Sequence, residues 1–475
     1  MNTKRTALMA QIRTFPRAFW MVNVMEMLER LAYYGVRVVI PIYIAQADEI
    51  NGLHFTQIQK GEIFMWWAIV QSLVPMFSGG FADRYGYKKT IALSIIFKII
   101  GYILMATQRA YFPFLLGALI LAFGTAIFKP GIQGTLVQTL DKKHSSVGWG
   151  MFYMLVNVGG FLGPPLAHFM YGISWPAVFY GCAVIVSLNF LVLLTYREIP
   201  AGGEQTMGPV QIMKMTFRNI IKPKLGFFII IMSGFWLMFM QLFDMLPNFI
   251  VDWVDTSHLV AWFNLPDWMT VETIRGTMIT QEWLINANAG LIVVAVVFVS
   301  WLVSKMRRVT SIFIGIIIAS LGLVAAGFTM SGTLVLLGIL MFSVGEMLAS
   351  PKMNEYLGII APPGEKGLYM GYANIPQAIG WGYGSLMAGH VYDEMGDKAN
   401  LAIRYMREHL NLSGEIERNE AFSRLMEATG KNAVDVTNLL WNTYHPYELW
   451  YRFAAIGIVS AIGIFIYSLV VKRNE

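Results

Sequence analysis

The stretch "GGFADRYGYKKT", residues 79–90, is a charged turn between two long apolar segments. Apolar residues fill most of 60–82 before it and of 89–107 after it. Glycines permit a tight turn between closely packed helices, and Asp83 can pair with Arg84 or a nearby lysine in one conformation and separate from it in another. The pattern predicts a turn between two membrane-spanning helices. A simpler alternative is that its basic residues only anchor the turn on the cytoplasmic side.

Apolar segments of similar length recur along the whole chain of 475 residues, of which 56% are hydrophobic and only 13% charged. A helix of about 20 apolar residues crosses a hydrocarbon core ~30 Å thick. We therefore predict an all-α membrane protein with twelve transmembrane helices, at 19–45, 60–82, 89–107, 111–138, 147–170, 174–195, 224–252, 283–304, 309–329, 332–360, 369–392 and 449–471.

The predicted helices fall into two groups of six. We predict an N-terminal bundle over 1–195, a cytoplasmic linker with a surface helix over 196–223, and a C-terminal bundle over 224–475. Lys and Arg collect in alternate short loops, which places both chain termini in the cytoplasm. The segment 393–448 then lies outside the cytoplasm, and the spacing of its apolar residues predicts a small helical cap.

The composition also argues against nucleic-acid binding, a metal site and enzymatic catalysis. The net charge of +6 comes from basic residues in short runs between apolar segments, which fits membrane topology and gives no face for nucleic acid. The single cysteine, Cys182, and the scattered histidines provide no metal-ligand spacing. No nucleophile motif or phosphate-binding glycine loop is present. We expect a monomer that is not an enzyme and that holds neither a metal nor a cofactor.

The first predicted helix contains "EMLERLAYYGVR", residues 26–37. Its Glu26, Arg30, Tyr33 and Arg37 are four, three and four residues apart and therefore share one helical face, with Glu29 at its flank. Each charge facing lipid would cost at least ~2.5 to 3.5 kcal/mol at the bilayer centre. The stripe must face a wet cavity or partners inside the bundle. The stripe alone fits an internal ion pair as well as a functional site.

Polar residues in other predicted helices favour a functional site. Lys129 stands in the apolar setting "FGTAIFKPGIQGT", Asn157 stands beside a glycine pair, and Glu346 stands in "FSVGEMLASP". A lysine in the fourth helix and a glutamate in the tenth are candidate partners across the two halves. Together with the first helix, they predict a cavity with a positive end and a negative end.

These motifs resemble known families. The turn at 79–90 resembles the signature of the major facilitator superfamily. The run from Glu26 to Gly35 resembles the ExxERFxYYG signature of the proton-dependent oligopeptide transporters, with Leu31 in place of Phe. Further matches to that family are "FYMLVNVG", "FKPG", "TQEWLINANAG", "GEMLASP" and "APPGEKGLYMG", and the resemblance extends from about residue 20 to about residue 392.

The resemblance implies roles for particular residues. Arg30 and Lys129 would receive the carboxylate of a peptide, while Asn157, Asn288 and Glu346 would surround its amino group. Tyr33 and Tyr34 would supply hydroxyl groups toward the peptide backbone. Proton coupling is implied for a group of five residues: Glu26, Glu29, Arg30, Lys129 and Glu346.

The sequence also departs from that family. The linker between the halves is too short for the two additional helices that most bacterial members carry, and Met240 stands where the family has a glutamate before Gln241. Asp244, four residues further and on the same face, is the alternative partner for Arg37. We assign gating to Arg37 with Asp244 and to Asp83 with Arg84, and expect a divergent relative.

We expect a proton-coupled symporter that imports di- and tripeptides across the cytoplasmic membrane by alternating access. Its partners would be the peptide or another zwitterion, protons and the lipid bilayer. A transporter of a different zwitterionic or anionic solute is one alternative. A non-transporting sensor or scaffold that binds a partner through 393–448 is another.

Overall fold

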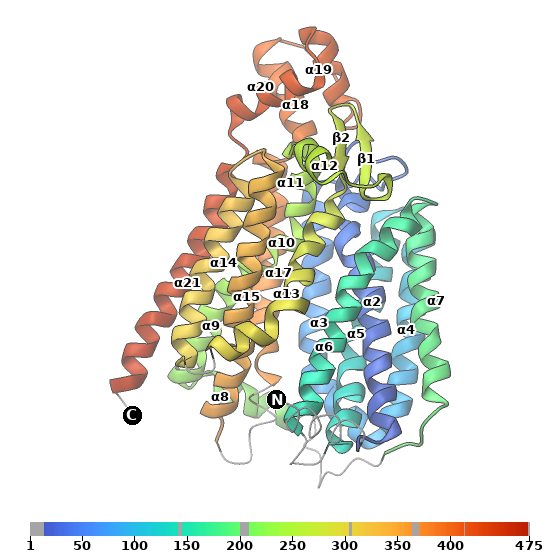
Figure 1. Cartoon of the computed structure of the whole chain (residues 1–475), viewed down its shortest axis with the longest axis vertical. Helices are drawn as coiled ribbons and strands as arrows, with labels where there is room; N and C mark the ends of the chain where they lie inside the picture. The colour runs from blue at the N-terminus through green and yellow to red at the C-terminus, as the bar shows by residue number, and fades with distance from the viewer. Residues whose placement is uncertain are drawn as a thin grey trace. The chain divides into compact units, whose positions relative to one another are not determined.

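The computed structural model describes residues 14–140, 145–199, 209–303, 306–362, 369, 371–412 and 414–473. Each of the twelve predicted spans coincides with a helix or with a run of short helices (Figure 1). The six helices of the first half are α2 (Arg17–Ala45), α3 (Gln57–Tyr85), α4 (Tyr87–Thr107), α5 (Tyr111–Gln138), α6 (Ser145–Tyr171) and α7 (Trp175–Leu193).

The linker contains α8 (Pro209–Ile220), a short helix where the sequence predicts one. The long helices of the second half are α9 (Pro223–Phe239), α13 (Gln281–Val303), α14 (Arg308–Gly327), α15 (Gly332–Ile360), α17 (Asn374–Met395) and α21 (Glu448–Arg473). Seven helices in the described part of the chain are long and apolar enough to cross a membrane by length and composition. The charges on α2 keep it outside this group, as expected for a helix with a polar face.

The seventh predicted span is broken into three helices. α9 is followed by α10 (Gln241–Asp244) and α11 (Leu246–Trp253), with interruptions at Met240 and Met245. Between this span and α13 the chain forms α12 (Ser257–Phe263), a 3-10 turn at Asp267–Met269, and an antiparallel hairpin of β1 (Thr270–Thr273) and β2 (Gly276–Ile279). Gly276 has a positive φ of 116°, which suits the tight connection between the two strands. The sequence analysis did not predict this hairpin.

The chain divides into two compact units. The first contains Met1–Val36 and Ile69–Asn219, and the second contains Arg37–Ala68 and Ile220–Glu475. Residues Arg37–Ala68 are a segment of the first half that belongs to the second unit. Both ends of this segment lie inside helices, one in α2 and one in α3. The second unit therefore includes the C-terminal part of α2, the N-terminal part of α3 and the loop between them. By the predicted orientation, these parts form the external end of the first two helices.

In each unit, the third and fourth helices of the half approach each other at backbone distance at glycines. A Cβ atom on Gly101 of α4 would lie 2.7 Å from the backbone nitrogen of Leu121 in α5. A Cβ atom on Gly322 of α14 would lie 2.5 Å from the backbone nitrogen of Phe342 in α15. Small residues allow such close approach, and in a membrane close packing is a main source of helix association. The third and fourth helices of both halves are thus packed in the same way, as a six-plus-six repeat predicts.

Three short helices form the cap that the sequence predicts within 393–448. They are α18 (Lys398–His409), α19 (Ala421–Thr429) and α20 (Ala433–Tyr444). Figure 1 shows them together at one end of the second unit, near α12 and the β1–β2 hairpin. The Asp397 side chain caps α18 by accepting a hydrogen bond from the Asn400 backbone nitrogen at 3.0 Å.

Candidate functional site

The first half of α2 carries a buried charge cluster inside the first unit. The Arg30 Nε atom lies 2.9 Å from Glu26 Oε1 and 2.9 Å from Glu29 Oε2. All three side chains are at most 10% exposed. The Glu26–Arg30 spacing of four residues places this pair on one helical face, and the arginine bridges to Glu29 at its flank.

Two lysines from neighbouring helices add positive charge to this cluster. The Lys98 Nζ atom of α4 lies 3.2 Å from Glu29 Oε1 and 3.6 Å from the ring centre of Phe128. Lys129 of α5 interacts electrostatically with Arg30, Glu26 and Glu29, yet forms no ion pair with any residue that the structure describes. Three cations therefore accompany two carboxylates. When both carboxylates are ionised, the cluster has one excess positive charge.

Tyrosines and glycines shape the surroundings of the cluster. The Tyr33 hydroxyl accepts a hydrogen bond from Gln71 Nε2 at 3.1 Å, and its ring lies 5.4 Å from the Arg30 guanidinium carbon. Tyr34 contacts α6 at Gly160, where a Cβ atom would lie 3.3 Å from the tyrosine ring. At Gly159 a Cβ atom would lie 2.4 Å from the Met27 carbonyl oxygen, so α6 approaches the charged turn of α2 at backbone distance.

Asn157 lies on α6, two residues before this contact. Its side-chain amide donates to the Tyr153 carbonyl at 2.8 Å, within its own helix. Its side-chain oxygen accepts no hydrogen bond that the structure records among described residues. Asn157 therefore retains an acceptor suited to an amino group.

The second unit contains a carboxylate with the opposite electrostatic character. Asn288 of α13 donates from Nδ2 to Glu346 Oε2 at 3.0 Å and to Ser343 Oγ at 2.9 Å, both on α15. Among the described residues, Glu346 has no cation within ion-pair distance. The sequence-predicted pair Asn288 and Glu346 is thus in direct contact, and its carboxylate is available to a positively charged group.

Arg37, in the part of α2 that belongs to the second unit, pairs with Asp244. Its guanidinium also donates to the Phe243 carbonyl at 3.2 Å and lies 4.6 Å from the ring centre of Phe64. Asp244 accepts a second hydrogen bond from the Ser385 hydroxyl of α17. The alternative partner that the sequence offered for Arg37 is the one observed.

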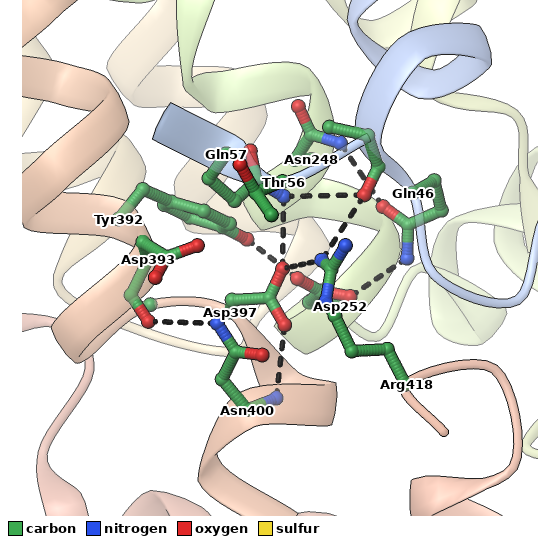
Figure 2. A network of polar contacts seen from close by, with 12 residues as sticks. Gln46, Thr56, Gln57, Asn248, Asp252, Tyr392, Asp393, Asp397, Asn400 and Arg418 are labelled. Atoms are coloured by element: carbon green, nitrogen blue, oxygen red, sulfur yellow. Dashed lines mark hydrogen bonds and ion pairs between the residues drawn. The ribbon is translucent and has the colours of Figure 1, made fainter. Parts of the chain in front are cut away.

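A chain of polar side chains continues from this pair toward the external end. Lys60 of α3 donates to Asn248 Oδ1 at 2.7 Å, and Asn248 donates to Gln46 Oε1 at 3.1 Å. Gln46 donates to Asp252 Oδ1 at 2.8 Å, and the Tyr392 hydroxyl donates to the other oxygen of Asp252 at 2.6 Å. Figure 2 shows the outer part of this chain, where side chains of α11 and α17 meet the loop after α2.

The sequence analysis missed two buried lysines, Lys98 and Lys60. Both are at most 2% exposed; Lys98 stands in an apolar run, whereas Lys60 has polar neighbours at the start of its span. An isolated lysine within a membrane span is itself a signal of a functional or paired site. The predicted gating residue Arg84 is exposed and lies 5.7 Å from the ring centre of Tyr85. The side chain of Asp83 lies outside the described residues.

The model of the major facilitator superfamily matches residues 23–385. The chain belongs to the major facilitator superfamily. Curated proteins of similar sequence include the multidrug resistance protein MdtH of Yersinia enterocolitica, which is 21% identical over 82% of this chain and 89% of that protein. An uncharacterized transporter of Bacillus subtilis, YclF, is 27% identical over 41% of this chain and 41% of its own length.

Solved structures of similar fold are described as transporters of the proton-dependent oligopeptide, or POT, family. One, in complex with a thioalcohol-conjugated peptide, has a TM-score of 0.69 and 16% identity over 96% of this chain and 97% of that one. Another, in complex with 5-aminolevulinic acid, has a TM-score of 0.64 and 16% identity over 91% and 97%. This superfamily member thus has the fold of a multi-pass transporter and is not an enzyme.

Proposed function

We propose that this superfamily member is a proton-coupled symporter that imports short peptides across the cytoplasmic membrane. The observation that carries the proposal is the opposite charge balance of the two clusters. The cluster of Arg30, Lys98 and Lys129 with Glu26 and Glu29 has one excess positive charge, while Glu346 is a carboxylate without a cation among described residues.

A zwitterion carries one group suited to each cluster. A carboxylate suits the excess positive charge at Lys129 and Arg30, and an ammonium group suits Glu346, whose carboxylate the Asn288 amide orients. Asn157 offers its amide oxygen as an acceptor for an ammonium group, and the hydroxyls of Tyr33 and Tyr34 serve the peptide backbone. The fold shared with transporters described as POT family members supports a peptide in this role.

The buried carboxylates support proton coupling. Removing one partner of a buried ion pair costs roughly 3–5 kcal/mol, whereas protonating a carboxylate neutralises it in place. A proton that moves inward gains about 2.3 kcal/mol per 100 mV of membrane potential. One or two protons on Glu26 or Glu29 therefore supply energy of the size needed to release Arg30 and Lys98 in each cycle, and the transporter needs no cofactor.

The test is uptake by proteoliposomes with an inward proton gradient. We expect accumulation of dipeptides, and we expect that N-acetylated or C-amidated dipeptides compete at least tenfold less well, since each lacks one charge of the zwitterion. Lys129→Gln and Glu346→Gln should abolish gradient-driven uptake, whereas Arg404→Gln, which alters an exposed pair on the cap, should preserve it. Failure of every member of a dipeptide library to accumulate would overturn the peptide assignment.

A second candidate substrate is a zwitterion that is not a peptide. The same charge balance accepts any molecule with a separated carboxylate and amine, and 5-aminolevulinic acid is bound by one transporter of this fold. The absence of a glutamate at Met240 distinguishes the chain from the usual peptide-transporter pattern. A screen in which amino acids or aminolevulinate raise the melting temperature, and dipeptides do not, would favour this candidate.

A further inference from the structure

We propose that Arg418, in the cap, is a positioning residue that holds the external ends of α2 and α3 against the C-terminal helices. The cap thereby stabilises the externally closed state of the transporter and sets how readily its external side opens. This inference rests on the proposed function only in assuming that the protein alternates between two states, and it does not depend on which solute is carried.

The Arg418 guanidinium contacts three acceptors from two different parts of the chain. It donates to the Phe55 carbonyl at 3.0 Å, to the Ala45 carbonyl at 3.3 Å and to Asp397 Oδ2 at 2.6 Å. Ala45 is the last residue of α2, and Phe55 lies just before α3. A planar guanidinium with five donors can serve such divergent acceptors at once, whereas an ammonium group cannot do so with the same geometry. Figure 2 shows the Arg418 side chain beside Asp397.

Asp397 completes the connection from the C-terminal side. Its Oδ2 atom accepts from Arg418 and from Gln57 Nε2, the latter at 2.9 Å, while its Oδ1 atom accepts from the Asn400 backbone nitrogen. The Asp397 side chain is only 3% exposed, and that of Arg418 is 20% exposed. The ion pair is therefore well shielded from water, and the hydrogen bond from Gln57 ties the first residue of α3 to Asp397 at the start of the cap.

The parts held by Arg418 are those that carry the external polar chain. Between Ala45 and Gln57 the loop after α2 contains Gln46, which bonds to Asp252 and Asn248. One helical turn into α3, Lys60 bonds to Asn248. If the external ends of α2 and α3 move away from α11 and α17, all of these bonds must break together with those of Arg418. The bonds of Arg418 thus add to the contacts that keep the external side closed.

Without the Arg418 contact, the ion pairs of the cap would stabilise only the cap itself. The other described ion pairs of the cap join residues within one short helix or its immediate flank, such as Arg424 with Glu420 and Arg404 with Glu408. These pairs are 45–52% exposed and lie four residues apart, so they contribute little beyond local helix stability. Arg418 alone among the described cap arginines bonds to the last residue of α2 and to Phe55, two residues before α3.

The experiment measures external opening directly, with a cysteine reporter and a membrane-impermeant maleimide. Ala68→Cys places the reporter on α3, one turn after Phe64, whose ring faces Arg37. Ala45→Cys places a second reporter next to Arg418. Both positions are 0% exposed, and the parent's single cysteine, Cys182, is buried and provides the baseline. Each reporter is combined with Arg418→Ala, with Arg418→Lys and with the control Arg424→Ala. No substrate and no proton gradient are present.

We expect Arg418→Ala to accelerate labelling of Ala68→Cys roughly tenfold, consistent with the loss of a largely buried ion pair. Arg418→Lys, which keeps the charge next to Asp397, should give an intermediate rate, and Arg424→Ala should leave the rate unchanged. Unchanged labelling at Ala68→Cys would overturn the proposal, and faster labelling at Ala45→Cys alone would reduce the role of Arg418 to local loop anchoring. Equal melting temperatures of parent and Arg418→Lys would show that the labelling difference does not reflect misfolding.

The same variants separate this inference from the transport assignment. Faster labelling without peptide uptake would support the positioning role of Arg418 and count against the proposed substrate. Peptide uptake with unchanged labelling would support the proposed substrate and count against the positioning role of Arg418. Where uptake is measurable, Arg418→Ala should lower the maximal rate of gradient-driven uptake more than it changes the half-saturating substrate concentration, because Arg418 does not contact the substrate clusters.

Discussion

The Arg37 guanidinium of α2 and the Asp244 carboxylate at the end of α10 form an ion pair that is almost completely shielded from solvent, at 2% and 0% side-chain exposure. Ser385 of α17 donates to the same aspartate, and Phe64 of α3 covers the guanidinium. One pair thus brings together three transmembrane helices and the short α10. Because this contact must break when α2 separates from α10 and α17, we propose it as a gate.

Removing Arg37 alone should destabilise the protein. Arg37→Met leaves Asp244 buried without its cation, and breaking a buried pair in this way costs roughly 3–5 kcal/mol. The double variant Arg37→Met with Asp244→Asn removes both charges and should recover most of that loss. Melting temperatures of the parent, the two single variants and the double variant form the measurement. Additive losses in the double variant would show that the two side chains are not energetically coupled.

Variants of the Lys98–Glu29 pair should distinguish an effect on stability from an effect on proton-coupled uptake. Lys98→Met leaves Glu29 with Arg30 as its remaining close partner and should lower the melting temperature, while Lys98→Met with Glu29→Gln should restore it. Because the double variant lacks one titratable carboxylate of the cluster, we expect gradient-driven uptake to fall while exchange of substrate across the membrane persists. Loss of exchange and uptake in equal measure would assign Lys98 and Glu29 to substrate binding.

Much of the fold could be predicted because membrane helices are specified locally. Roughly 20 consecutive apolar residues suffice to define a span, so the helix bounds followed from the sequence to within a few residues. The break of the seventh span into α9, α10 and α11 could not be predicted in this way. It arises around Met240 and Met245, residues that are ordinary in a helix, and their backbone conformation depends on tertiary packing.

The candidate site was predicted less completely for a different reason. Residues on one helix, such as Glu26 and Arg30, reveal their shared face through spacing, and motif resemblance added Asn288 with Glu346. Lys98 reaches Glu29 from another helix, 69 positions away, and no spacing rule connects them. Arg418 reaches α2 and α3 from a cap loop more than 360 positions away, which only the folded chain discloses.

The contact of α6 with α2 at Gly159 should not tolerate a methyl group. Gly159→Ala would place a Cβ atom 2.4 Å from the Met27 carbonyl oxygen, so the two helices must separate where Glu26 and Arg30 lie. Overpacking of this kind costs typically 1–3 kcal/mol. Gly150→Ala on the same helix is the matched control, because nothing lies within 4 Å of its added atom. A Gly159→Ala protein with the parent's melting temperature and uptake would contradict the close approach.

Lys398, at the start of α18, should make the cap more stable as the pH rises. Burial lowers the pKa of Lys398 well below its usual range, and Arg275 lowers it further against the opposing effects of Asp252 and Asp48. Its ammonium group lies 4.1 Å from the ring centre of Phe422 and 5.7 Å from that of Trp253.

The folded state therefore favours neutral Lys398, while the unfolded chain binds its proton up to a pKa of about 10.4. Between the lowered pKa and that value the unfolded state holds more protons, so the free energy of unfolding increases with pH. Lys398→Met removes the desolvation cost, and we expect a higher melting temperature at neutral pH and a weaker pH dependence. Lys431→Met, at an exposed cap position, is the control and should change neither. A melting temperature of Lys398→Met below that of the parent at neutral pH would mean that charged Lys398 stabilises the cap through its aromatic neighbours.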